Sequence, residues 1–132
     1  MKFIPDRVDE ASLKAATKKM ALEVIKLVNE LPRTKSGEVL GKQLLRSATS
    51  VAANYRAACR ARSDAEMLAK MGTVEEEADE TCLWLELLTE SGTCKADIAG
   101  HLHHEYSRIT AIAVASKKTL RTGIEKRGNT PR

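Results

Sequence analysis

Apolar residues recur at steps of three and four along most of this chain, and short breaks divide the pattern into four segments. Steps of this length place side chains on one stripe of an α-helix, whereas a half-buried strand requires strict alternation. The first segment carries its stripe on Leu13, Ala16, Met20, Val24, Leu27 and Leu31. The pattern therefore predicts a fold built from helices alone.

Turn residues and capping residues indicate where each helix begins and ends. The first helix stops at LPRTKSG, where Ser36 is a candidate N-cap for a second helix at about 37–61. SDAE at 63–66 has the spacing of a capping box and starts a third helix, which runs to about residue 90. A fourth helix covers about 96–121. The expected core residues of these three helices are, in chain order, Leu44 or Leu45, Ala48, Val51, Ala52, Tyr55 and Cys59; Met67, Met71, Val74, Ala78, Leu85 and Leu88; and Ile98, Leu102, Tyr106 or Glu105, Ile109, Ile112 or Ala113, and Leu120.

Short connections favour antiparallel neighbours, so the expected fold is an all-α, antiparallel up-down-up-down four-helix bundle. A length of 132 residues suits a single domain, which we place at residues 1–122. Residues 123–132 lack an apolar period and are expected to form a basic, disordered tail. No stretch approaches the roughly 20 apolar residues that span a bilayer, and the N-terminus lacks the apolar core of a signal peptide. The expected location is the cytoplasm, where the cysteines stay reduced.

Charge is segregated along the chain. Residues 1–62 carry 13 Lys/Arg against 6 Asp/Glu, residues 63–105 carry 2 against 11, and residues 106–132 carry 7 against 1. One acidic segment therefore lies between two basic ones, although the net charge is only +4. Such an asymmetry indicates either an anionic partner for the basic segments or pairing between segments.

The densest acidic run, EEEADE at residues 75–80, lacks the features of a metal or catalytic site. A di-iron bundle needs a Glu-x-x-His motif on two of its helices, and this sequence contains none. HLHHEYSR at 101–108 also lacks the H-E-x-x-H spacing of zinc enzymes, so its histidines are expected on the surface. P-loop, G-x-S-x-G and G-x-G-x-x-G motifs are absent too. The sequence indicates no enzyme, metal site or cofactor.

The outer line of the third helix changes from acidic to apolar. At 100° per residue, Glu76 and Glu80 lie opposite the core, and the same line continues to Leu83 and Leu87, with Trp84 beside them. A helix that is apolar on two faces must be covered on more than one side. We interpret this line as a homo-oligomer interface. The alternative is a tilted helix whose outer leucines are covered within the monomer.

The second helix carries a band of basic residues away from its core line, made of Lys42, Arg46, Arg56 and Arg60. Three roles remain open for this band. It can pair with Glu76 and Glu80 across the bundle or across a subunit interface, it can bind phosphate, or it can form a solvated face.

The run LRSATSVAANYRAACRARSDAEMLAKMGTVEEEADETCLWLELLTESG resembles the bacterial four-helix-bundle family first noted in intervening sequences of 23S rRNA genes. The similarity extends over about residues 10–120 and is strongest in RSATS, ANYR, EEADE and WLELL. The resemblance implies a small cytosolic bundle that assembles into a ring-shaped homopentamer. Related bundles are accessory subunits of diversity-generating retroelements, in which a basic pentamer binds nucleic acid and contacts a reverse transcriptase. One departure is Ala57, where the family commonly carries Glu; if that Glu pairs with a neighbouring arginine, Arg56 or Arg60 is freer here.

Two functions are therefore expected. The first is a non-enzymatic, pentameric bundle that binds RNA or DNA by charge, because aromatic residues for base stacking make up only 3% of the chain. The alternative is an adaptor or accessory subunit that docks on a reverse transcriptase or another nucleic-acid enzyme. The candidate nucleic-acid residues are Lys42, Arg46, Arg56, Arg60, Arg62, Lys117, Lys118, Arg121, Lys126 and Arg127, and the candidate interface residues are Glu76, Glu80, Leu83, Trp84 and Leu87.

Overall fold

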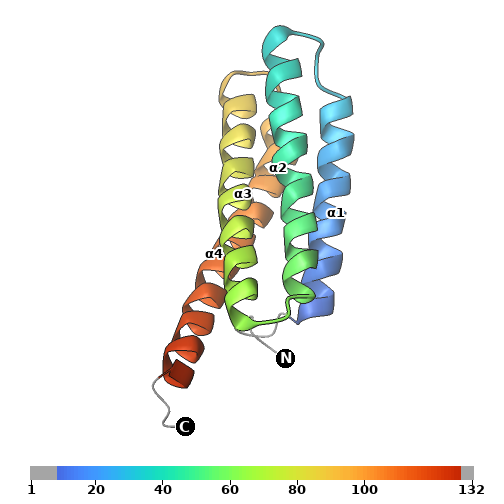
Figure 1. Ribbon diagram of the computed structural model, residues 1–132. Coiled ribbons are helices and arrows are strands. Elements are labelled where there is room, and N and C mark those ends of the chain that lie inside the picture. The colour runs from blue at the N-terminus through green and yellow to red at the C-terminus, as the bar shows by residue number, and fades with distance from the viewer. Residues whose placement is uncertain (1–8, 129–132) are drawn as a thin grey trace.

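The computed structural model describes residues 9–128, and every regular element in that range is a helix. Helix α1 spans Glu10–Asn29, α2 spans Lys35–Cys59, α3 spans Asp64–Glu90 and α4 spans Ala96–Gly128. Figure 1 shows the helices gathered into a bundle, with successive connections at alternate ends of the molecule. The prediction of an all-α chain with four helices is confirmed.

Polar side chains cap the starts of the helices. The Asp9 carboxylate accepts a hydrogen bond from the Ser12 N–H at 2.7 Å, and Ser63 Oγ accepts one from the Glu66 N–H at 3.1 Å. The Glu66 carboxylate in turn accepts from the backbone N–H of Arg62 at 3.3 Å. Ser63 is therefore the N-cap of α3 as predicted, whereas the Glu66 carboxylate reaches back to the N–H of Arg62 rather than to that of Ser63.

The cap of α2 differs from the prediction. Thr34 replaces Ser36 as the N-cap, because Thr34 Oγ1 accepts a hydrogen bond from the Gly37 N–H at 3.0 Å. Gly37 is buried against the connection between α1 and α2, where an added Cβ would lie 2.4 Å from the Pro32 carbonyl oxygen. A side chain at this position would therefore clash with the connection, and the Thr34 cap starts the helix at Lys35, before the predicted boundary.

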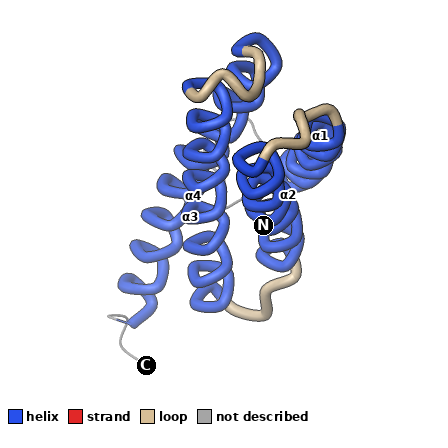
Figure 2. Tube along the Cα trace, turned by 90° about the horizontal axis from the view of Figure 1, so that it is seen from above, coloured by secondary structure: helices blue, strands red, loops and turns tan. Residues whose placement is uncertain are grey.

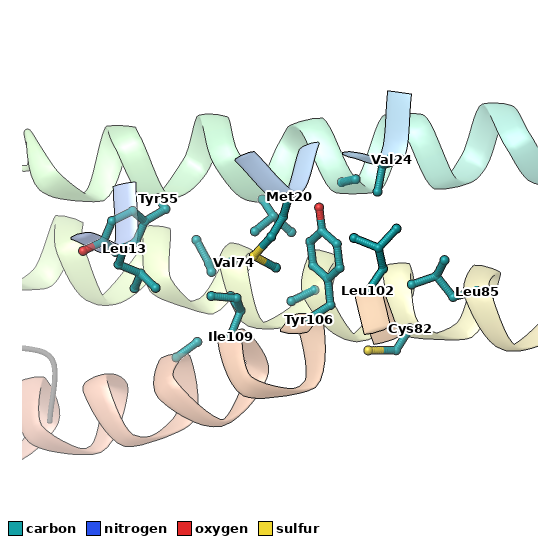
Figure 3. Packing of buried hydrophobic residues seen from close by; sticks show 14 of the residues in the cluster. Leu13, Met20, Val24, Tyr55, Val74, Cys82, Leu85, Leu102, Tyr106 and Ile109 are labelled. Carbon is teal, nitrogen blue, oxygen red and sulfur yellow. The ribbon is translucent and has the colours of Figure 1, made fainter. Parts of the chain in front are cut away.

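The core follows the predicted stripes, and Figure 3 shows its side chains converging between the helices. All six predicted core residues of α3 are buried, and α2 uses the fully buried Leu44 rather than Leu45. The prediction for Ile98 is wrong: this side chain is 52% exposed, whereas Ala99 is 1% exposed. Both positions lie about one helical turn before Leu102, so periodicity cannot choose between them, and the packing of α4 against α3 selects Ala99.

Helix α3 occupies the central position in the bundle. It packs extensively against both α2 and α4, while α1 packs against α2 and touches α4 only sparsely. Figure 2 shows α3 beside α4 and α1 beside α2. The acidic helix is therefore bordered on both flanks by helices from the two basic parts of the chain.

Helix α4 continues past its predicted end. It remains helical to Gly128, so the prediction of a disordered tail is wrong for residues 123–128, and residues 129–132 lie outside the described range. Leu120 is buried, and Arg127 forms an ion pair with Asp64 at the start of α3. The ion pair of Arg127 links this extension of α4 to α3.

Candidate nucleic-acid interface and assembly surface

The acidic run of α3 is bordered by cations from both neighbouring helices. From α2, the Arg46 guanidinium lies 2.9 Å from the Glu77 carboxylate and also forms an ion pair with Glu80. From α4, Lys117 Nζ lies 3.0 Å from the Glu75 carboxylate. Three of the five carboxylates in residues 75–80 are thereby paired within the chain.

These contacts decide a question that the sequence leaves open for Arg46. Its pairing with acids of the third helix lies within one bundle and needs no second subunit. Glu80 is partly exposed, and its carboxylate pairs with the Arg46 side chain that reaches across from α2. Glu76 is exposed as predicted, and Asp79 is exposed as well. Within residues 75–80, the exposed acidic groups are thus Glu76 and Asp79.

One further pair ties α4 to α3 through a histidine. His103 Nε2 lies 2.8 Å from the Glu86 carboxylate, and the His103 side chain is half-buried. His101 and His104 are exposed, in agreement with the surface placement expected for this tract. The sequence misses the contact of His103 with Glu86, because the partner depends on the register of α4 against α3. The spacing of residues within α4 carries no information on that register.

The ten candidate nucleic-acid residues differ in whether they form ion pairs within the bundle. Arg46, Lys117 and Arg127 take part in the ion pairs with α3. Lys126 is exposed. The candidates that are exposed and form no ion pair with any described residue are Lys42, Arg56, Arg60, Arg62, Lys118 and Arg121.

Ala57 has a direct bearing on two of these cations. It lies between Arg56 and Arg60 in sequence and is half-buried on α2. An alanine at this position supplies no carboxylate to either arginine. Both guanidinium groups therefore remain available to an external anion.

The outer surface of α3, which we define as Glu76, Asp79, Leu83 and Leu87, is apolar in its second half. Leu83 is 45% exposed and Leu87 is 40% exposed, so the neighbouring helices do not cover them. The alternative in which the bundle itself buries both leucines is wrong. Trp84 is half-buried and packs against the core, so only part of its ring belongs to this surface.

Other kinds of site find little support in residues 9–128. Within that range, no group of three or more His, Cys, Asp and Glu side chains is placed to hold a metal ion. Burial raises the pKa of the Cys59, Cys82 and Cys94 thiols, which favours the unreactive protonated form. No helix of the described chain is long and apolar enough to cross a membrane.

A family model described as 23S rRNA-intervening sequence protein matches residues 11–115. The chain belongs to this family. The matched range begins in the first turn of α1 and ends within α4, so it includes the whole of α2 and α3. Membership in the 23S rRNA-intervening sequence family confirms the resemblance seen in RSATS, ANYR, EEADE and WLELL.

One solved structure supports the family fold. It is a protein with unknown function from the S23 ribosomal protein family of Bacteroides thetaiotaomicron, and it is 29% identical to this chain with a TM-score of 0.74. The alignment covers 80% of this chain and 98% of that protein. No curated protein is similar enough to match.

Proposed function

We propose that this chain is a non-enzymatic, homo-oligomeric subunit that binds RNA or other nucleic acid through its exposed basic side chains. In this proposal the helices form an antiparallel up-down-up-down bundle, and copies of it assemble into a ring of five in the cytoplasm. The pentameric state is the one that the family resemblance implies. The three free cysteines within the described residues suit a reducing compartment.

The proposal of nucleic-acid binding rests on one observation: only some of the basic candidates form ion pairs within the bundle. Acids of α3 already hold Arg46, Lys117 and Arg127 within the bundle. Six other candidates, Lys42, Arg56, Arg60, Arg62, Lys118 and Arg121, are exposed and form no ion pair with a described residue, and each can displace a counterion from a phosphate. This family member therefore exposes basic side chains that its own ion pairs do not use.

The aromatic side chains indicate what kind of binding this is. Tyr55 and Tyr106 are fully buried, and Trp84 packs against the core. Base stacking on these rings is therefore limited, and phosphate contacts supply most of the affinity. Binding is expected to be sensitive to salt and weakly selective for sequence.

Self-assembly is supported by the exposed leucines on the outer surface of α3. Leu83 and Leu87 lie one helical turn apart and form an apolar strip on a helix whose opposite side fills the core. Burying such a strip against another copy would remove both side chains from water, which is favourable at about 25 cal/mol per Å² of apolar area.

A filter-binding titration with labelled RNA, repeated from about 50 to about 200 mM salt, tests nucleic-acid binding. If five cations meet phosphates, the plot of log affinity against log salt should have a slope between about −3 and −5. Absence of binding at the lowest salt, or an affinity that ignores salt, rules the proposal out. A mass measurement on the same sample tests the pentamer independently.

The outer surface of α3 also favours a second candidate, an adaptor that docks on a reverse transcriptase or another nucleic-acid enzyme. Its exposed Glu76 and Asp79 suit a basic partner, and Leu83 and Leu87 supply apolar contact. A pull-down of such an enzyme with the variant Glu76→Lys, Asp79→Lys, in which both charges are reversed, tests this function. Glu80 is left intact because it pairs with Arg46. The adaptor function is ruled out if the variant keeps the oligomeric state of the wild type and captures the enzyme as well as the wild type does.

A further inference from the structure

Charge is distributed unevenly along the long axis of the bundle. Figure 1 places the first turns of α1, the α2–α3 connection and the second half of α4 at one end of the molecule. We call residues 9–15, 54–70 and 117–128 the basic end; they contain ten Lys/Arg and five Asp/Glu in 36 residues. The opposite end, residues 24–42 and 84–100, contains five of each in 36 residues.

Contacts between the segments confirm that the basic end is one region of the molecule. The ion pair of Arg127 with Asp64 brings the end of α4 to the start of α3, directly after the α2–α3 connection. The first turn of α1 lies nearby: burial raises the pKa of Cys59 near the end of α2, and the Glu10 carboxylate adds to that shift. Residues far apart in sequence therefore share this end.

Several acids of the basic end already have partners. Asp9 caps α1, Asp64 pairs with Arg127, and Glu66 accepts a hydrogen bond from the Arg62 backbone. The cations here that are exposed and form no ion pair with a described residue include Arg56, Arg60, Arg62, Lys118 and Arg121. Positive potential is thus concentrated at this end of the bundle.

We propose that nucleic acid docks on the basic end, with its sugar–phosphate backbone across the α2–α3 connection and the second half of α4. The inference rests on the proposed nucleic-acid binding and adds the place where it occurs. The five cations come from α2, the connection and α4 rather than from a single loop. A spread of this kind suits an extended polyanion better than one small anion. The acids at residues 75–80 make the middle of the bundle unfavourable for phosphates, which directs the ligand to the end.

Two matched variants, each of which removes four positive charges, test the location. The basic-end variant is R60Q/R62Q/K118Q/R121Q, and the opposite-end control is K26Q/R33Q/K35Q/K95Q, whose four positions lie outside the candidate nucleic-acid residues. The substitutions leave the backbone N–H groups of Arg60 and Arg62 in place for their hydrogen bonds at the end of α2 and to Glu66. Circular dichroism, urea unfolding and a mass measurement verify that both variants fold and assemble as the wild type does.

Binding of a labelled RNA hairpin and of the matching DNA hairpin is then measured over a range of salt concentrations. The basic-end variant should lose about tenfold or more in affinity at low salt, and its log–log salt slope should be shallower by about 3. The control should stay within about twofold of the wild type. Equal losses in the two variants, or a larger loss in the control, overturn the location while the proposed function stands. A wild type that binds anionic phosphatidylserine vesicles but neither hairpin overturns both proposals.

Discussion

At the scale of single residues, Tyr106 carries a hydroxyl group that is buried without a hydrogen-bond partner among the described residues. The residue is fully buried, and Figure 3 shows its ring among Met20, Val24 and Leu102. No other described protein group lies within hydrogen-bonding distance of its hydroxyl. A buried hydroxyl without a partner is unfavourable by about 1–3 kcal/mol. Burial also raises the pKa of Tyr106, because the phenolate would lose its hydration.

Tyr106→Phe should therefore leave the free energy of unfolding at pH 7 unchanged or increase it by about 1 kcal/mol. Because the pKa of Tyr106 is higher in the folded state than in the unfolded state, its ionisation favours unfolding. The free energy of unfolding is therefore unaffected by this group below the unfolded-state pKa of about 10 and falls as the pH rises above it. The phenylalanine variant lacks this group, so its stability should decline less than that of the wild type in that range. Urea unfolding at several pH values measures both effects.

Leu102→Ala provides the control for that measurement, since Leu102 is fully buried and its truncation should lower stability by about 2–5 kcal/mol. A loss of more than about 1 kcal/mol in Tyr106→Phe at pH 7 would contradict the prediction. Such a loss would show that the hydroxyl makes a stabilising contact in the folded protein.

At the scale of elements, α4 is longer than its apolar period indicates, and its glycines offer a test. An added Cβ at Gly123 would meet only Arg127 Nη1 at 3.5 Å, an ordinary contact, and at Gly100 it would meet nothing within 4 Å. Alanine is favoured over glycine inside a helix by about 0.5–1 kcal/mol. Gly123→Ala and Gly100→Ala should each raise the free energy of unfolding by about that amount. If residues 123–128 were an unstructured tail, only the change at Gly100 would stabilise the protein.

The junction between α3 and α4 makes a separate prediction for two adjacent lysines. Lys117 is mostly buried and lies 3.0 Å from the Glu75 carboxylate, whereas Lys118 is exposed and forms no ion pair with a described residue. Lys117→Gln should lower the free energy of unfolding by up to about 1 kcal/mol. The matched change Lys118→Gln should stay within about 0.5 kcal/mol of the wild type.

Thermal unfolding at low and high salt separates the two lysine variants. The difference between them should shrink at about 1 M salt, because salt screens the partly exposed Glu75 carboxylate. Equal melting temperatures at low salt would show that the contact of Lys117 with Glu75 contributes nothing to stability.

At the scale of the whole molecule, neighbouring leucines of α3 should separate folding from assembly. Leu85 is 1% exposed and fills the core, so Leu85→Ala should lower the free energy of unfolding by about 2–5 kcal/mol. Leu83 and Leu87 are exposed, so the double change Leu83→Ser, Leu87→Ser should keep the helical circular dichroism signal and yield monomers by mass measurement. A variant that keeps the oligomeric mass would show that copies of this chain meet through another surface.

Local features of the sequence determined much of this structure. The steps of Met67, Met71, Val74 and Ala78 predict the buried face of α3, and Ser63 predicts its start. These features could be read from the chain because helical periodicity and capping depend on residues within a few positions of one another. The exposure of Leu83 and Leu87 follows from the same geometry, since both lie opposite that face.

The arrangement of charge was decided only by the tertiary structure. Which acid meets Arg46, Lys117 or Arg127 depends on the residue that a neighbouring helix brings alongside, and periodicity within one helix contains no such information. The same reason explains why Ala99 replaces Ile98 in the core. The sequence by itself determined four amphipathic helices and one acidic segment between basic ones. Packing of the helices decided which basic side chains form ion pairs within the bundle and which remain exposed together at one end.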